Sequence, residues 1–402
     1  MPTIHQSFRT SYTYDVHFTA GVFDAHNELL GRIIESGSDP VPHEILIVLD
    51  DGLLAHYPGL SEQIYDYFAN RPSLAPASEP VIVPGGEAAK NDPALVDRLH
   101  RAIYEAGLCR HSYVLAVGGG AVIDLAGYAA ATAHRGVRLI RIPTTVLAQN
   151  DSAVGVKNGV NRFNVKNFLG AFAPPFAVVN DSAFLHTLDD RDWRSGISEA
   201  VKVALLKDPE FFDEIEANAS ALSPRERRLE PMQHLIRRCA ELHLEHIATS
   251  GDPFEMGSSR PLDFGHWAAH QLEQLTDYRL RHGEAVAIGI ALDTTYSHLQ
   301  GLFSASEWER TIQLFEQVGF DVYVPELDEH IDEMDHPRCL FRGLEIFREH
   351  LGGQLTIMLL EGIGRGVEVH DVDHDVYRNA IEILRDRQAT APCESNAMRD
   401  IA

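Results

Sequence analysis

Short, wholly apolar runs recur through the first half of the chain, at residues 45–49, 81–83, 113–117 and 139–142. Each run has the length of a β-strand that is buried on both faces. Between the runs, apolar residues follow helical spacing: Leu95, Leu99, Ile103 and Tyr104 come after Asn91-Asp92-Pro93, which is typical of a capped helix start. This alternation predicts a mainly parallel sheet covered by helices.

The pattern differs at the beginning and in the second half of the chain. Aromatic and apolar residues at positions 8, 12, 14, 16 and 18 alternate with polar ones and predict one or two half-buried strands. After about residue 190, long stretches of 3.6-residue period dominate, as at 231–247 and 285–299. We therefore predict an α/β domain over residues 1–188, a mainly helical domain over 189–387, and a loose tail over 388–402.

Composition narrows the possible functions. The 402 residues include 34 Lys and Arg against 59 Asp and Glu, a net charge of −25, which argues against sequence-independent binding to nucleic acid or anionic lipid. The four cysteines form no CxxC pair, which favours a reducing cytoplasm. No signal pattern is present, and no apolar run approaches the roughly 20 residues that span a bilayer. We expect a soluble cytoplasmic protein.

A glycine-rich turn follows one of the predicted strands. Residues 114–117 lead into Gly118-Gly119-Gly120 and then into a helix start. Successive glycines let backbone N–H groups approach a phosphate, and the helix N-terminus adds its positive end. The alternative is a purely structural tight turn. Asp50, directly after the first strong apolar run, stands where an acidic residue would hold a ribose hydroxyl, or where it would cap a helix.

Polar residues that bind anions are interleaved with small residues between Pro143 and Gly170, namely Thr144, Thr145, Lys157, Lys166 and Asn167. In an acidic protein the two lysines would supply the positive field that a phosphate needs. The alternative is a pair of surface lysines on an irregular loop.

Histidines with metal-ligand spacing lie in the helical half. His266 and His270 are four residues apart and would share one helix face, His282 follows, and Glu199 stands upstream in a helical stretch. Two neutral imidazoles and one carboxylate make a three-ligand site with an open position, the usual arrangement for catalytic zinc. With 21 histidines in the chain, a pair at this spacing also arises by chance.

Together these segments resemble the sugar phosphate cyclase superfamily, which includes dehydroquinate synthase. The resemblance covers roughly residues 40–370. Its strongest parts are six segments in the family's order, at 118–136, 142–161, 165–175, 195–202, 263–270 (DFGHWAAH) and 281–289 (RHGEAVAIG). It implies an N-terminal Rossmann-like NAD-binding domain and a C-terminal helical metal domain, with the active site in the cleft between them and a homodimer as the assembly.

The resemblance also assigns roles to single residues. It implies that zinc, or cobalt, is bound by Glu199, His266 and His282. The positions that match NAD contacts are Asp50, Glu87, Lys90, Gly119, Gly120, Asp124, Thr144, Thr145, Lys166, Phe184 and Thr187. Around the substrate's phosphate and hydroxyls it places Lys166 again, together with Arg135, Asp151, Lys157, Asn167 and Lys202, and it places His270 near the reacting hydroxyl.

The chemistry that the resemblance implies consumes no cofactor. NAD removes a hydride from a secondary alcohol, the resulting ketone acidifies the neighbouring C–H, and phosphate leaves by β-elimination. The hydride then returns, the ring opens, and an intramolecular aldol addition closes a carbocycle. Cationic side chains steady the departing phosphate.

Several positions depart from dehydroquinate synthase, which binds a substrate carboxylate. Asp263 replaces an asparagine, His350 stands where a late lysine is expected, and Arg260 precedes Asp263 by three positions instead of four. A lysine usual in the preceding helix is missing from 241–246. The loss of positive charge favours a substrate with a hydroxymethyl group, such as sedoheptulose 7-phosphate. Structural roles, a helix cap for Asp263 and a surface turn for His350, are the alternatives.

Three functions follow from these observations. Asp263 and His350, with His270 retained, most resemble the 2-epi-valiolone synthases and the Ebo-cluster type of sedoheptulose 7-phosphate cyclase. The second reading is a dehydroquinate synthase with a remodelled pocket. The third is an NAD- and metal-dependent polyol dehydrogenase of the glycerol dehydrogenase type. A binding module without activity fits worst, because candidate metal and phosphate groups are all present.

Overall fold

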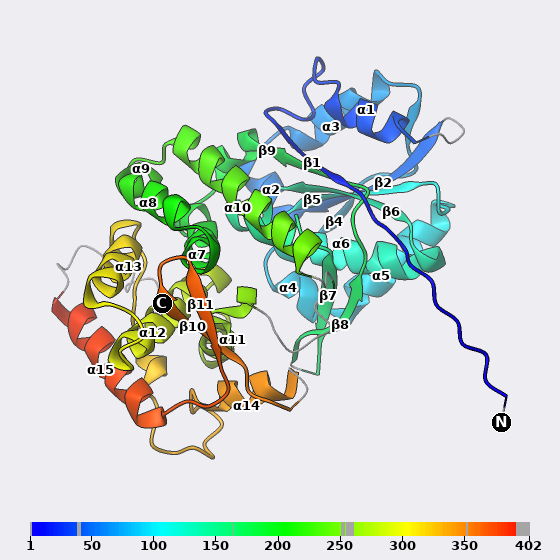
Figure 1. The fold of residues 1–402 in the computed structure, drawn as a ribbon. Helices are drawn as coiled ribbons and strands as arrows, with labels where there is room; N and C mark the ends of the chain where they lie inside the picture. Colours follow the sequence, from blue (N-terminus) through cyan, green and yellow to red (C-terminus); the bar gives the residue numbers. More distant parts are fainter. Residues whose placement is uncertain are drawn as a thin grey trace. The chain divides into compact units, whose positions relative to one another are not determined.

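The computed structural model describes residues 2–37, 42–163, 165–250, 254, 261–350 and 353–390, and its chain divides into two units (Figure 1). Unit 1 comprises Met1–Thr144 and Gly155–Ala183, and unit 2 comprises Thr145–Val154 and Phe184–Ala402. The segment 145–154, which the sequence analysis places in the first domain, thus packs with the helical unit.

A parallel sheet organises unit 1, with strand order β1-β9-β6-β5-β2-β3 and β4 also paired to β2. Helices α1 and α3 cover one side and α5 and α6 the other (Figure 1). The apolar runs predicted as buried strands are confirmed, since β2 and β5 pair along their length and are almost wholly buried. The strands are β1 Asp15–Thr19, β2 His43–Asp50, β3 Leu74–Pro76, β4 Val81–Val83, β5 Tyr113–Gly118, β6 Arg138–Pro143 and β9 Ala177–Asp181.

Of the one or two strands expected between residues 8 and 18, the structure has one, β1, and residues 8–14 are not part of it. Only β1, from Asp15 onwards, joins the sheet, because its partner β9 pairs with residues 15–19 alone. Phe8 and Tyr12 have exposed fractions of 80% and 58%. Alternation without a neighbouring strand to accept the backbone hydrogen bonds does not make a strand.

Two helices of unit 1, α5 and α6, begin where the sequence predicts. Asp92 caps α5 by accepting a hydrogen bond from the Ala94 N–H, and Pro93 occupies the first helical position. Helix α6 starts at Gly120, directly after the glycine turn. The helical segments are α1 Leu29–Glu35, α2 Asp51–His56, α3 Leu60–Ala69, α4 Ala88–Asn91, α5 Pro93–Glu105, α6 Gly120–Thr132 and the 3₁₀ turn η1 Ala133–Arg135.

The polar segment after Pro143 is only partly a loop. Residues 157–172 form an antiparallel hairpin of β7 (Lys157–Arg162) and β8 (Val165–Phe172). The buried guanidinium of Arg141 donates to the Gly155 carbonyl at 2.6 Å and to Asn158 Oδ1 at 2.8 Å. These bonds satisfy buried polar groups at the base of the hairpin, so its polar residues serve partly as structure.

Unit 2 is mainly helical, as predicted, and is built around α12. This helix is buried from Gly283 to Ser297 and packs against α7, α11, α13 and α15. Its elements are the π-helix η2 Ala148–Ser152, the 3₁₀ turns η3 Ser182–Thr187, η4 Pro261–Asp263 and η5 Pro325–Leu327, the helices α7 Asp190–Lys207, α8 Pro209–Ala217, α9 Ala219–Leu222, α10 Leu229–Thr249, α11 His266–Leu275, α12 His282–Leu299, α13 Ala305–Gln317, α14 Arg342–His350 and α15 His374–Thr390, and the hairpin of β10 Ile357–Gly362 and β11 Arg365–Val369.

The C-terminal helix of unit 2 is longer than the sequence predicts. Residues 388–390, which were expected to belong to a loose tail, are helical, because α15 continues to Thr390. The Gln388 side chain accepts a hydrogen bond from the Val322 N–H and donates one to Asp321. Residues 391–402 lie outside the described residues. Among the described helices, none combines the length and apolar character that crossing a bilayer requires.

Glycines bring α12 into backbone contact with two neighbouring helices. A Cβ atom at Gly283 would lie 2.0 Å from the Ser195 carbonyl oxygen on α7, and one at Gly289 would lie 2.0 Å from the Gly265 carbonyl oxygen. Gly265, which precedes α11, has a φ of +75°, a conformation that side chains disfavour. The starts of α11 and α12 are therefore set by main-chain packing.

Candidate active site

The carboxyl edge of the unit 1 sheet carries the glycine turn. Strand β5 ends at Gly118, Gly119 is extended, and α6 begins at Gly120, so the predicted strand–turn–helix arrangement is confirmed. The Thr144 N–H donates to the Gly118 carbonyl oxygen and closes the neighbouring strand end. A helix N-terminus that follows a tight glycine turn is suited to binding a phosphate.

Asp50 ends β2 at the same edge. Its carboxylate accepts hydrogen bonds from the N–H groups of Gly52 at 2.9 Å and Gly119 at 3.2 Å. Burial raises the pKa of Asp50, and the two backbone hydrogen bonds counteract the rise. The structure thus shows the capping role for Asp50, while the ribose contact stays a prediction.

Four of the residues named by the resemblance meet in one polar network of unit 1. Lys90 Nζ lies 2.7 Å from Asp124 Oδ2 and also donates to Asn167 Oδ1. Asn161, which the sequence analysis missed, accepts from the Asn167 N–H at 2.8 Å and donates to Glu87 at 2.6 Å. Lys90 is buried, so this network fixes a cation close to the start of α6.

Three other basic residues of unit 1 do not gather at one point. Lys157 is exposed at the first residue of β7, whereas Lys166 lies near the turn of the hairpin. Arg135 is exposed beyond the C-terminal end of α6, and this 13-residue helix places it about 20 Å from the glycine turn. The phosphate contacts expected for these three residues stay a prediction.

Glu199, His266 and His282 come together in unit 2. Glu199 is fully buried on α7, and the two histidines are the first residues of α11 and α12. Glu199 Oε1 lies 3.4 Å from His266 Nε2 and 3.3 Å from His282 Nε2. One ligand atom from each residue lies within 4.8 Å of the others, a spacing that suits one metal ion.

The orientation of the two imidazoles fits a cation. His266 Nδ1 lies 3.0 Å from the Phe264 carbonyl oxygen, and His282 Nδ1 lies 3.3 Å from Glu273 Oε2. Both partners are acceptors, so each can hold an Nδ1 proton and leave the Nε2 of that ring to face Glu199. Histidines that bind a metal are commonly oriented by outer acceptors in this way.

A buried ion-pair chain adjoins this cluster. Lys202 Nζ lies 2.5 Å from Glu199 Oε2, and Asp151 Oδ1 lies 2.9 Å from His243 Nδ1. Burial acts to lower the pKa of Lys202, but the carboxylates of Glu199 and Asp151 outweigh it and raise that pKa. Burial likewise acts to raise the pKa of Glu199, and the Lys202 charge holds it well below its usual range. Lys202 is therefore held as an ammonium ion.

His243 is the site residue that the sequence analysis missed. It lies on α10, in the stretch where the family's lysine is absent, and it reaches Asp151 on η2. Burial and the Glu199 charge act to raise the pKa of Asp151, yet the hydrogen bond from His243 brings it below its ordinary value. The sequence offered one signal for His243: it lies in the predicted helix at the stretch where the lysine usual in the family is absent.

His270 packs against both histidines of the cluster. Its ring centroid lies 5.4 Å from that of His266 and 6.0 Å from that of His282, and it stacks on the latter. His270, Glu273 and His282 also satisfy the spacing of a metal site. We interpret Glu273 as the acceptor that orients His282, because its carboxylate lies on the Nδ1 side of that ring.

The remaining predicted residues of unit 2 either make local contacts or lie outside the described residues. Thr145 accepts from the Ala148 N–H, and Thr187 donates to the Phe184 carbonyl, so these three residues support local turns. Asp263 ends η4, and Gly265 rather than Asp263 is the N-cap of α11. Arg260 and the side chain of His350 lie outside the described residues.

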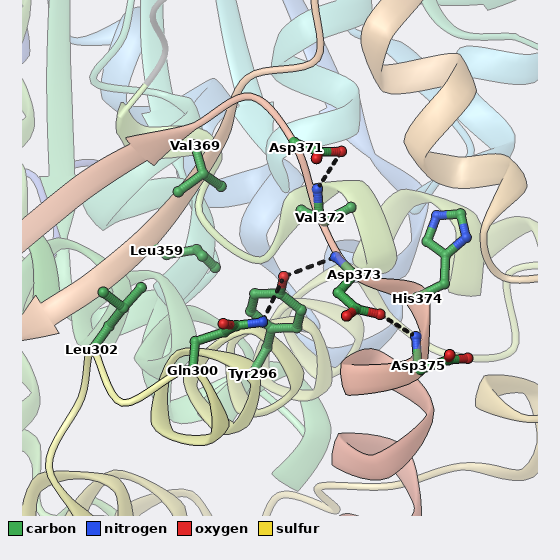
Figure 2. Close-up of a pocket in the computed structure, with 10 residues that line it drawn as sticks. All are labelled: Tyr296, Gln300, Leu302, Leu359, Val369, Asp371, Val372, Asp373, His374 and Asp375. Atoms are coloured by element: carbon green, nitrogen blue, oxygen red, sulfur yellow. Dashed lines mark hydrogen bonds between the residues drawn. The ribbon is translucent and has the colours of Figure 1, made fainter.

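A cavity of about 600 Å³ in unit 2 contains none of the predicted site residues (Figure 2). It is lined by Tyr296, Gln300, Leu302, Leu359, Val369 and residues 371–375. The Tyr296 hydroxyl accepts from the Asp373 N–H at 2.9 Å, and the Asp373 carboxylate accepts from the Asp375 N–H at 2.8 Å (Figure 2). This cavity lies where α12 meets the start of α15.

Comparison with known families covers both units. The family described as 3-dehydroquinate synthase N-terminal matches residues 80–195, and the one described as 3-dehydroquinate synthase C-terminal matches residues 196–337. A 3-dehydroquinate synthase of Halorhodospira halophila is 36% identical over 332 residues, which cover 80% of this chain and 89% of the relative.

Two valiolone synthases are similar over more of the chain. The 2-epi-5-epi-valiolone synthase of Streptomyces glaucescens is 33% identical and is aligned over 93% of this chain and 92% of its own length. The solved structure of ValA, a 2-epi-5-epi-valiolone synthase from Streptomyces hygroscopicus with NAD⁺ and Zn²⁺ bound, has a TM-score of 0.82 at 30% identity and covers 96% of this chain and 100% of its own. The chain therefore belongs to the 3-dehydroquinate synthase-like family of sugar phosphate cyclases, enzymes of the lyase type.

Proposed function

We propose that this enzyme is an NAD- and zinc-dependent lyase that converts sedoheptulose 7-phosphate into a valiolone-type cyclitol, with 2-epi-valiolone as the favoured product. The similarity to a valiolone synthase that binds NAD⁺ and Zn²⁺ supports the cofactors, and cobalt is expected to replace zinc. A cytoplasmic homodimer and an active site in the cleft between the two units belong to the same proposal.

The observation that carries the choice of substrate is the charge around Lys202. Three carboxylates act on this one ammonium, those of Glu199, Asp151 and Asp263. Its charge is therefore already compensated, and Asp263 adds a negative charge where dehydroquinate synthase has a neutral asparagine. A substrate carboxylate beside Asp263 would be repelled by about 1 kcal/mol or more, whereas a hydroxyl would donate a hydrogen bond to it.

When bound, zinc supplies a Lewis acid for a substrate hydroxyl, and NAD supplies a reversible hydride acceptor. Glu199, His266 and His282 are the residues that would hold the metal. Lys202, kept charged by its carboxylate neighbours, steadies negative charge on a substrate oxygen.

Two histidines are available for proton transfer in this proposal. His270 presents an imidazole against His266 and His282, and we assign it the proton that moves between the reacting hydroxyl and the phosphate. His243, whose Nδ1 lies 2.9 Å from Asp151 Oδ1, is the second imidazole, beside a carboxylate that acts on Lys202.

The experiment compares two sugar phosphates that differ at one end. We expect phosphate release from sedoheptulose 7-phosphate with a kcat/KM about 100-fold above that for the carboxylate-bearing heptulosonate phosphate, and a 2-epi-valiolone spectrum in NMR of the product. The Asp263→Asn variant should narrow this ratio about tenfold, since 1.4 kcal/mol corresponds to a factor of ten.

Two outcomes would replace the proposal. Faster turnover of the heptulosonate phosphate would identify a 3-dehydroquinate synthase, the activity named for several relatives. Accumulation of NADH in proportion to the substrate consumed would identify a polyol dehydrogenase, because the cyclase returns its hydride within each cycle.

A further inference from the structure

A buried carboxyl group lies in the middle of α12, away from the ion pairs described so far. Asp293 has no exposed surface. Its carboxylate accepts from Trp267 Nε1 at 2.9 Å, from the Tyr377 hydroxyl at 2.8 Å and from the Gly265 N–H at 3.1 Å. Because burial dominates and all three donors are uncharged, the pKa of Asp293 rises to about 7.

Two of these three donors flank the proposed metal ligand His266. Gly265 and Trp267 are its immediate neighbours in sequence, and Gly265 is the left-handed residue from which α11 starts. Oδ2 of Asp293 holds the Gly265 backbone, while Oδ1 holds the Trp267 indole. Asp293 on α12 thus holds the residue before and the residue after His266, the first residue of α11.

The third donor connects this point to the C-terminal helix. Tyr377 on α15 packs edge-on against Trp267 at 5.2 Å and stacks on Tyr296 at 4.1 Å between ring centroids. Tyr296 in turn holds the Asp373 N–H at the start of α15 (Figure 2). The tyrosine hydroxyl is therefore presented to Asp293 by a rigid aromatic stack.

We propose that Asp293 is a positioning residue for His266, setting the place of its imidazole by holding Gly265 and Trp267, and thereby setting the affinity for the metal. The inference rests on the proposed function only in taking Glu199, His266 and His282 as the metal ligands. Outer groups that orient metal ligands typically change affinity by about 10- to 100-fold when they are removed.

The test measures the dissociation constant for zinc alone, by competition with a chromophoric chelator, on folded protein without substrate or NAD. Asp293→Asn keeps one acceptor oxygen for Trp267 and Tyr377 but turns an amide N–H₂ toward the Gly265 N–H, so we expect about tenfold weaker binding. Asp293→Leu removes all three bonds and should weaken binding about 100-fold. A shift of the visible absorption of bound Co²⁺ in Asp293→Asn would report the displaced imidazole.

Two control variants separate positioning from general stability. Thr295 is equally buried on α12 and also accepts from an indole, that of Trp308 at 2.9 Å, so Thr295→Val removes a comparable bond away from α11. Tyr377→Phe removes only the third donor. Both should bind zinc within twofold of the unmodified enzyme, whatever their melting temperatures.

Each outcome decides the inference. Zinc affinity unchanged in Asp293→Asn and Asp293→Leu, or lowered equally in Thr295→Val, overturns it, and Asp293→Asn alone decides if the leucine variant does not fold. Zinc binding that survives His282→Ala would overturn both this inference and the assigned metal site. Expected zinc affinities with no turnover of sedoheptulose 7-phosphate would overturn the proposed function and leave the role of Asp293 standing.

Discussion

The glycine-turn edge of unit 1 and the histidine cluster of unit 2 are built in different ways. At the edge, the groups suited to a ligand are backbone N–H groups at the start of α6, and Asp50 acts on them through main-chain hydrogen bonds. In the cluster, the groups are side chains contributed by α7, α11 and α12. Replacing one side chain should weaken ligand binding only moderately at a site made of backbone groups. At a site made of three ligand atoms, losing one atom should abolish metal binding.

The largest effect should follow the loss of one ligand. His282→Ala removes a nitrogen from the cluster, and two remaining ligands seldom hold zinc in a catalytic site. We expect zinc binding to fall below detection and turnover to fall by at least about 1,000-fold. The exposed His234 on α10 provides the matched control, since His234→Ala should alter neither quantity. Retention of zinc and turnover by His282→Ala would contradict the difference between the two regions.

An intermediate effect should follow the loss of the buried ammonium. Lys202→Met keeps the length of the side chain but leaves Glu199 without its closest cation, so the metal-free protein should lose about 3 kcal/mol of unfolding free energy. Zinc would replace the missing charge, so its addition should raise the melting temperature more in the variant than in the unmodified protein. Equal shifts in the two melting curves would show that Lys202 and the metal do not share the Glu199 charge.

The smallest effect is expected at the backbone-built edge. Asp50→Asn keeps one acceptor oxygen but cannot serve both Gly52 and Gly119, so we expect about 1 kcal/mol lower stability and about tenfold weaker NAD⁺ binding, measured by calorimetry. Asp92→Asn is the control, because the Asp92 side chain caps α5 through the Ala94 N–H and not the glycine turn. It should lose little stability, because asparagine caps a helix about as well as aspartate, and it should keep its NAD⁺ affinity. A 1,000-fold loss in Asp50→Asn would remove the distinction between the two regions.

The sequence predicts most strongly what depends on neighbouring residues. The apolar runs of β2 and β5 and the Asp92-Pro93 cap of α5 are local signals, and the structure has these elements where they are predicted. The hairpin β7–β8 was not predicted, because its buried Asn158 and Asn161 find partners on Arg141 and Glu87, which come from other segments. No local pattern indicates that a buried asparagine is satisfied by such a distant partner.

Tertiary contacts that leave no local sequence pattern also explain which residues of the candidate site could not be predicted. Glu199, His266 and His282 were named through resemblance to a family, and the structure brings them together. His243 reaches Asp151 only because η2 packs against α10, a tertiary contact between segments far apart in sequence. Asp293 carried no signal, since a lone acidic residue in an apolar helix gives no indication of its partners.

The backbone contact between Gly289 and Gly265 has a consequence for how such an enzyme changes its substrate. Main-chain atoms fix where α11 starts relative to α12, and Asp293 holds the chain on both sides of His266. None of these contacts involves Asp263. If Asp263 selects between a carboxylate and a hydroxymethyl group as we propose, exchanging it should leave the ligand spacing the same. A scaffold of this kind lets selection alter substrate preference by single substitutions without rebuilding the catalytic centre.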